Sequence, residues 1–267
     1  MRWSKIKNII ILLLVVVNAF LLAQVGLREW RSRRDERETR ERMIAILARN
    51  DVTYLPEEIP GALALAPRRV SLSPLGEAEA AILVGAVSGT QSQGSRTFYT
   101  GEDGTAAYAS TGELTVEFSP GGTLAESDIL DRLSRLGVTL EETGRTGTAG
   151  SAAVTYVQLW NGVPVPGETA LLTLRDQGPA TLTLRLLRGE EESLPAEETI
   201  TAATALTRLL EELSRGEGYV CSQITRMYPG YLLSGSVTAT LTPAWFIETD
   251  TWHFIVDGVT GAVTAAE

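Results

Sequence analysis

The chain of 267 residues carries 33 acidic and 23 basic side chains and a formal net charge of −10. Only three basic residues precede the first long apolar run and every acidic residue follows it, so the rest of the chain carries about −13. This charge excludes nucleic acid as a favoured partner, because phosphate binding requires a basic surface. The single cysteine, Cys221, excludes an internal disulfide and a cysteine zinc cluster.

Residues 8–27 contain no charged side chain and predict a transmembrane anchor. Twenty residues in a helix rise about 30 Å, which is the thickness of a hydrocarbon core. A cleaved signal peptide is the competing interpretation, but its apolar region is usually shorter and ends in a small-x-small site. The short basic tail favours a cytoplasmic amino terminus. We therefore expect a single-pass protein of the cell membrane with an extracytoplasmic C-terminal domain.

Residues 28–49 are dense in helix formers and predict a juxtamembrane helix. Opposite charges recur four residues apart, as in Arg31 and Asp35, and such pairs favour a helix. A solvated spacer is the main interpretation, and a dimerising coil is the alternative. Beyond it, residues 50–74 contain four prolines and predict an irregular connection. Residues 96–119 alternate short β-type runs with glycine-rich turns, which predicts a meander of antiparallel strands.

The order of a helix followed by strands then occurs twice. Residues 123–137 predict a helix that ends at Gly137, and the Asn161-Gly162 pair between two later strand-like runs predicts a hairpin turn. Residues 201–214 predict a second helix, again followed by strand-like runs. The predicted fold class is α+β, with a single N-terminal transmembrane helix and then tandem modules of a helix packed on a curled antiparallel sheet.

This interpretation divides the chain into five parts. They are an N-terminal tail and anchor (1–27), a juxtamembrane helix (28–49), a linker and β-rich segment (50–121), a first α+β module (122–189) and a second (190–267).

The residue types argue against catalysis. The one histidine, His253, lies in an alternating strand pattern, where a surface histidine is a commoner finding than a catalytic one. Cys221 is more often a small strand residue than a nucleophile in such a setting. No lysine follows Lys7, which excludes Ser-Lys and Schiff-base catalysis outside the membrane. A glycosidase carboxylate pair stays open, but we expect no enzyme activity, no cofactor and no metal site.

Aromatic and polar side chains supply two further predictions. Trp160, Trp245, Trp252 and Phe254 lie in alternating strand runs beside turns, so we expect them to be buried core residues. Asn18 is the one polar residue deep in the apolar segment. An amide in hydrocarbon either bonds its own backbone or bonds a partner helix, where such bonds average about 0.6 kcal/mol.

The opening MRWSKIKNIIILLLVVVNAFLL resembles the start of the YycI family of membrane-anchored regulators of the WalK sensor kinase. Trp3, Asn18 and Phe20 are among the matching residues, while Arg2 stands where the family usually has Asp. The segments YVQLWNGVPVPGETALLTL and LTPAWFIETDTWHFIVDGVTGAV resemble the family's hairpin and closing strands, and the latter also resembles PepSY-like domains. Residues 28–150 match poorly.

The resemblance implies a pair of extracytoplasmic α+β modules without a catalytic site. It also implies partners in the membrane, namely a sensor histidine kinase and a YycH-like companion, with Asn18, Trp3 and Phe20 as candidate contact residues. The leading hypothesis is therefore a non-enzymatic regulator. The alternatives are a PepSY-like envelope module that binds, inhibits or helps to fold a secreted peptidase, and a receptor for lipid or peptidoglycan fragments.

Overall fold

The computed structural model describes residues 38–57, 59–119, 124–148, 150–175, 178–195, 197–215, 218–236 and 238–266. The predicted anchor, residues 8–27, and the candidate contact residues Trp3, Asn18 and Phe20 lie outside these ranges. Among the described residues, no helix is both long enough and apolar enough to span a membrane.

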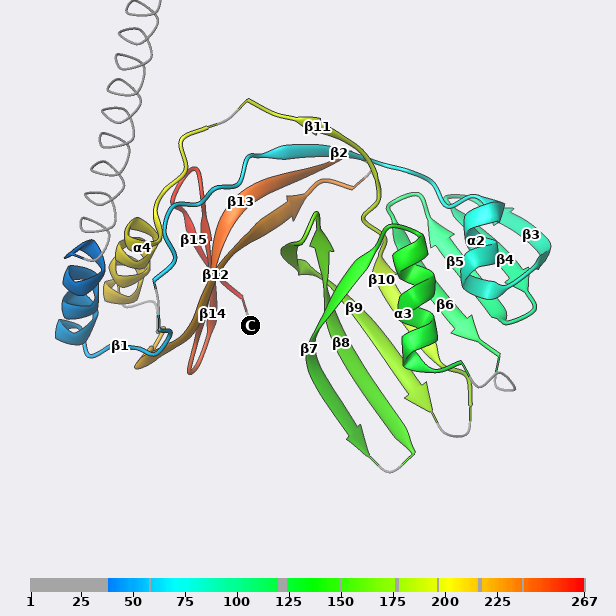
Figure 1. The fold of residues 1–267 in the computed structure, drawn as a ribbon, viewed down its shortest axis with the longest axis horizontal. Coiled ribbons are helices and arrows are strands. Elements are labelled where there is room, and N and C mark those ends of the chain that lie inside the picture. The colour runs from blue at the N-terminus through cyan, green and yellow to red at the C-terminus, as the bar shows by residue number, and fades with distance from the viewer. Residues whose placement is uncertain are drawn as a thin grey trace, which may run out of the picture.

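Two large sheets, here called sheet A and sheet B, dominate the described residues (Figure 1). Sheet A has a path β1-β12-β13-β14-β15, and β2 adds to it by pairing with β13 and with β11. Its strands are β1 (Thr53–Tyr54), β2 (Arg68–Leu72), β11 (Gly189–Ser193), β12 (Gln223–Ser234), β13 (Thr238–Thr249), β14 (His253–Asp257) and β15 (Val263–Ala266). The helix over residues 38–49 and α4 (Ala202–Ser214) cover one face and share a hydrophobic core with it.

Sheet B has eight antiparallel strands in the order β3-β4-β5-β6-β10-β9-β8-β7, so β3 and β7 are its edges. The strands are β3 (Val87–Gln93), β4 (Arg96–Gly101), β5 (Gly104–Ala109), β6 (Glu113–Phe118), β7 (Thr139–Thr148), β8 (Ser151–Trp160), β9 (Val163–Arg175) and β10 (Thr181–Arg185). Two helices, α2 (Glu77–Val84) and α3 (Glu126–Arg135), pack on one face. In α3 the buried Ile129 and Leu133 lie one turn apart and so face the sheet together.

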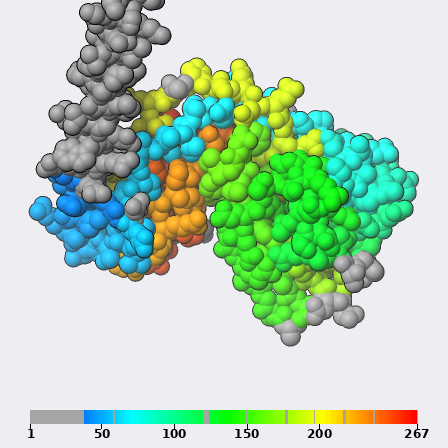
Figure 2. Space-filling view, viewed as in Figure 1, coloured from blue at the N-terminus to red at the C-terminus, as the bar shows by residue number. Residues whose placement is uncertain are grey.

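Sheet B and its helices are an insertion into the unit built on sheet A. The chain leaves sheet A after β2 and returns as β11, which pairs antiparallel with β2 so that Leu72 lies opposite Gly189. Figure 1 shows these two strands running side by side above the junction, and Figure 2 shows their side chains covering its top. We call residues 73–188 the inserted unit.

The predicted fold class is wrong in its architecture. Helices and antiparallel sheets are both present, so the coarse α+β description holds. The chain does not form successive modules of one helix on one curled sheet, because sheet B carries two helices and sheet A draws strands from both ends of the described chain. The transmembrane helix of that prediction has no counterpart among the described residues. The two-unit architecture has no local sequence signal, because β2 and β11 pair across more than a hundred residues.

The β8–β9 hairpin joins the two units. Its turn has the predicted conformation, with positive φ at Asn161 (51°) and Gly162 (80°). Next to the turn, Val165 is fully buried against Tyr231 and Leu241 of sheet A. Of the aromatic side chains expected in the core, Trp245 and Phe254 are buried and confirm the prediction. The other two, Trp160 and Trp252, are only half-buried.

Candidate docking groove beside an edge strand

The residues considered for chemistry on sequence grounds are dispersed in the structure. His253 is exposed on β14, and Cys221 is half-buried before β12, where burial raises the pKa of its thiol. Within the described part of the chain, no group of three or more His, Cys, Asp or Glu side chains is placed to hold a metal. The candidate site is therefore a surface feature that the sequence patterns did not single out.

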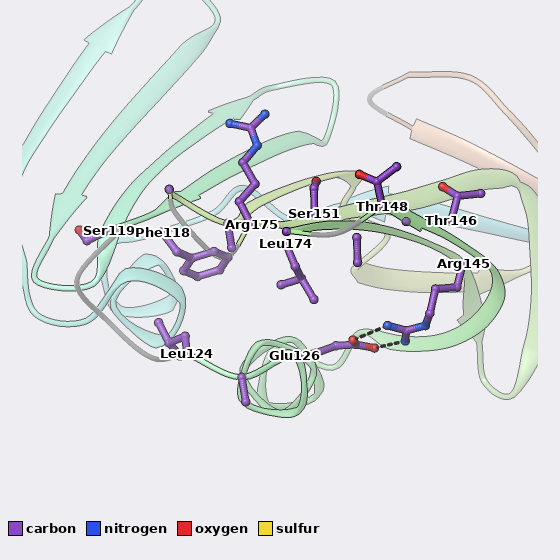
Figure 3. Close-up of a pocket in the computed structure, with 16 residues that line it drawn as sticks. Phe118, Ser119, Leu124, Glu126, Arg145, Thr146, Thr148, Ser151, Leu174 and Arg175 are labelled. Atoms are coloured by element: carbon purple, nitrogen blue, oxygen red, sulfur yellow. Dashed lines mark hydrogen bonds and ion pairs between the residues drawn. The ribbon is translucent and has the colours of Figure 1, made fainter.

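A groove of about 540 Å³ lies beside the first turn of α3. There the strands of sheet B continue past the end of the helix and are not covered by it. Figure 3 shows Phe118 and Leu174 pointing into the space between sheet and helix, with Leu124 across from them. The same view shows Thr146 and Arg175 pointing away on the other face of the sheet. We call this space the docking groove; it is lined by Phe118, Ser119, Leu124, Ala125, Glu126, Arg145, Thr146, Gly147, Thr148, Gly150, Ser151, Ala152, Leu174, Arg175, Gly178 and Ala180.

The floor of the docking groove is one row of five residues, of which four lie on β6, β9, β8 and β7 and one, Ala180, directly precedes β10. The row is Phe118, Ala180, Leu174, Ala152 and Gly147; the amide of Phe118 bonds the carbonyl oxygen of Ala180, and Ala152 lies opposite both Leu174 and Gly147. Side chains alternate between the two faces of a strand, so all five lie on the face that carries the helices. Because three of the five are alanine or glycine, the row leaves space where the helix no longer covers it.

An ion-pair cluster closes one end of the docking groove. Nη1 and Nη2 of Arg145 donate to the two carboxylate oxygens of Glu126 at 3.0 and 2.7 Å, as Figure 3 shows. Nε and Nη2 of the same guanidinium donate to Glu142 at 3.0 and 2.8 Å. The buried Tyr156 hydroxyl donates to Glu126 at 2.5 Å. Two carboxylates facing one guanidinium leave this end with a formal charge of −1.

These contacts set the protonation of the cluster. Hydrogen bonds from Arg145 and then from Tyr156 hold the pKa of Glu126 below its ordinary value, although partial burial opposes them. The hydrogen bond from Arg145 likewise lowers the pKa of Glu142. Burial, and then the bond to Glu126, raises the pKa of the Tyr156 hydroxyl. The carboxylates are therefore ionised at neutral pH and form a fixed acidic wall, with no group poised to exchange protons.

Local sequence explains why Glu126 is placed there. The backbone N–H of Ala125 donates to the Asp128 carboxylate at 3.0 Å, which fixes the first turn of α3. Acidic residues in a first turn, Glu126 and Asp128, and basic residues in the last, Arg132 and Arg135, suit the helix dipole. Glu126 thus stabilises the helix end and holds Arg145 of β7 against it.

Strand β7 forms the outer rim of the docking groove and is paired on one side only, with β8. Every residue of β7 except Leu140 is exposed. A register shift between Glu142 and Gly144 divides the ladder into two regular stretches, and the stretch beside the docking groove runs from residue 144 to residue 148. On the helix-bearing face this part presents only Arg145 and Gly147, and Gly147 has no side chain to separate the rim from the floor.

A second hollow, of about 630 Å³, lies between α2, α3 and the β8–β9 turn. Several of its polar side chains are bonded across it. Arg188 pairs with Glu79, while Trp160 Nε1 and Asn161 Nδ2 donate to Glu191 at 2.9 and 3.2 Å. These bonds tie the hairpin tip and α2 to the connection between the units, which gives this hollow a structural role.

Comparison with known proteins supports the fold alone. No protein-family model matches the sequence, and a search of curated proteins finds no match. The crystal structure of an uncharacterized protein from Eubacterium rectale is similar, with a TM-score of 0.52 over 81% of this chain and 90% of that chain at 11% sequence identity. Residues 73–188 are less than half of the chain, so a similarity of this extent covers both units.

Proposed function

We propose that the chain is a non-enzymatic regulator of a two-component sensor histidine kinase. It acts by protein contact with the kinase and a companion regulator, and residues 8–27 hold it at the membrane with the described domain outside. The observation that carries the proposal is the docking groove, a hollow with a partly apolar floor and an acidic wall beside an unpaired strand edge. Such a surface suits another polypeptide, because an edge offers backbone hydrogen bonds and a hollow receives side chains.

Two further features support a binding role. Glu126, Glu142 and Arg145, which form the acidic wall, are bonded to one another, so they shape and charge the surface. Two of the three segments that resemble the YycI family lie among the described residues. Residues 156–174 fall in the β8–β9 hairpin that joins the units, and residues 241–263 fall in β13–β15 of sheet A.

Site-specific photocrosslinking in native membranes tests the proposal. The full chain would carry a photoreactive amino acid at Thr148, on the groove rim, and in a matched protein at Thr90, on the opposite edge strand β3. We expect sensor-kinase or companion peptides from Thr148 only. Crosslinks confined to a secreted peptidase would favour the PepSY-like alternative and overturn the regulator.

Regulation itself needs a second measurement. Autophosphorylation of the crosslinked kinase in proteoliposomes should change about fivefold or more when the full chain is present, which is the usual range for coupling between sites. An unchanged rate would contradict a regulatory role. For the orientation, protease added to intact protoplasts should remove the outer domain, whereas recovery of a mature protein that begins after Ala23 would contradict an uncleaved anchor.

A further inference from the structure

Strand β7 is both a free edge of sheet B and the rim of the docking groove. This combination indicates what kind of partner would fit. The floor row ends at Gly147 of β7. A partner strand paired with β7 would add one residue to this row, directly beside Gly147. Its side chain at that position would lie over Gly147 and Ala152, because neither residue carries a side chain large enough to exclude it. A strand edge and a side-chain hollow in register are the two requirements of recognition by strand addition.

We propose that β7 and the docking groove bind an extended segment of a partner protein, which pairs with residues 144–148, places an apolar side chain over Gly147 and a basic side chain beside Glu142. The inference deepens the proposed function, since it names the binding mode of that same surface. Pairing through the backbone would supply affinity, and the groove and the acidic wall would supply specificity.

The expectation of an apolar partner side chain over Gly147 follows from the residues of the groove floor. Phe118 is almost fully buried, whereas Leu124, Leu174, Ala152 and Ala180 keep part of their surface in water. Covering this partly exposed apolar surface removes it from water and is therefore favourable. A polar side chain at the same position would find few groups to bond, because Glu126 and Arg145 are already bonded to one another.

The expectation of a basic partner side chain beside Glu142 follows from the net charge of the ion-pair cluster. Arg145 cancels one of the two carboxylates that it bonds, so one negative charge remains, and Glu142 is the more exposed of the two at 42% against 24%. Glu142 lies on the same face as Gly147, toward the start of β7. Same-face residues of an added strand recur every two positions. The basic residue is thus expected two or four positions from the apolar one.

The opposite edge of sheet B does not combine these features. Strand β3 is also unpaired on one side and exposed along its length after Val87. None of its residues lines either of the two large hollows in the described part of the inserted unit. It would offer backbone groups without a receiving space, so it serves as the internal reference.

Selection of a displayed library of random 12-residue peptides against the full chain in detergent tests the proposal. Recovered peptides should share an apolar residue with Arg or Lys two or four positions away. Ala152→Leu, which fills the groove, should weaken their binding at least about tenfold. Ala153→Leu adds the same volume on the opposite face of β8 and should leave binding unchanged.

A measurement on the peptide side does not depend on how the variants fold. Methylation of single backbone nitrogens should abolish binding at alternate positions, because only every other amide of a paired strand faces its neighbour. Failure to recover peptides, or recovered peptides that bind Ala152→Leu equally well, would overturn the proposal. Concentration-dependent dimerisation that Ala152→Leu abolishes would overturn it in favour of a second copy. Peptide binding without any effect on a kinase would support this binding surface and contradict the proposed function.

Discussion

Gln158 and Leu187 are joined by a buried hydrogen bond in which the side-chain Oε1 of Gln158 accepts the backbone N–H of Leu187 at 2.9 Å. The Nε2 of the same side chain donates to the carbonyl oxygen of Arg185 at 2.8 Å. Gln158 is 1% exposed and lies at the register shift between β8 and β9. One side-chain amide thus satisfies two backbone groups where the chain leaves sheet B toward sheet A.

Gln158→Leu should be strongly destabilising. It removes both bonds and leaves a buried N–H and C=O without partners, at about 1–3 kcal/mol for each unsatisfied group. Urea unfolding of the variant should show a loss of about 2–6 kcal/mol. Gln91→Leu, on the exposed face of edge strand β3, is the matched control and should change stability little. A near-neutral Gln158→Leu would mean that the backbone groups find other partners.

Gly230→Ala should test how closely the two units approach. A Cβ at Gly230 would lie 2.7 Å from the Phe246 ring and 2.8 Å from the carbonyl oxygen of Pro164 on β9. Such overpacking costs about 1–3 kcal/mol. Gly167→Ala, on β9, meets no atom within 4 Å and is the control. Thermal melts in which both variants unfold alike would contradict the close junction.

Arg185 should couple the inserted unit to sheet A. It pairs with Glu168 at 3.0 Å, with both side chains less than one-fifth exposed, and it donates to the carbonyl oxygens of Gly235 and Ser236. Arg185→Met leaves a carboxylate unpaired and should cost about 3 kcal/mol. In the double variant with Glu168→Gln, part of this loss should be recovered. Hydrogen exchange should also rise in the β12–β13 turn, and unchanged exchange there would contradict the coupling.

Protonation of Glu126 should lower the free energy of unfolding in mild acid. Because its pKa is lower when folded than its ordinary value of 4.5, the folded state binds fewer protons than the unfolded state. Its stabilising contribution is complete above the unfolded pKa and is lost as the pH falls through the folded value. Glu126→Gln should lower stability at pH 7 by about 1 kcal/mol and flatten this pH dependence. Glu117→Gln, an exposed carboxylate on β6, is the comparison, and equal pH profiles for the two variants would contradict the assignment.

The sequence predicts the elements whose signals are local. Leu and Ile spacing with a Gly stop places α3 within residues 123–137, and the periodic apolar residues of 201–214 place α4. The Asn161-Gly162 turn needs only positive φ at two residues. Each of these signals acts over fewer than 20 residues, so the local sequence pattern is sufficient to predict the element.

The docking groove and the insertion leave no such signal. Strand β7 is polar on both faces, because it is an edge, so it shows no alternation that marks a strand. The floor row draws its residues from four strands and from Ala180 just before β10, and their adjacency depends on the order of strands in the sheet. The strand Arg68–Leu72 follows a proline-rich stretch and reads as connection until its partners in β11 and β13 are known.

The insertion also dictates an order of assembly during synthesis. Strand β2 leaves the ribosome about 120 residues before its partner β11, and β1 waits longer for its partner β12, so neither has a partner for about ten seconds at ordinary elongation rates. Sheet B lies wholly within that interval and completes its own pairings first. On this order of synthesis, the inserted unit can fold first and bring the two ends of the interrupted sheet together before that sheet closes.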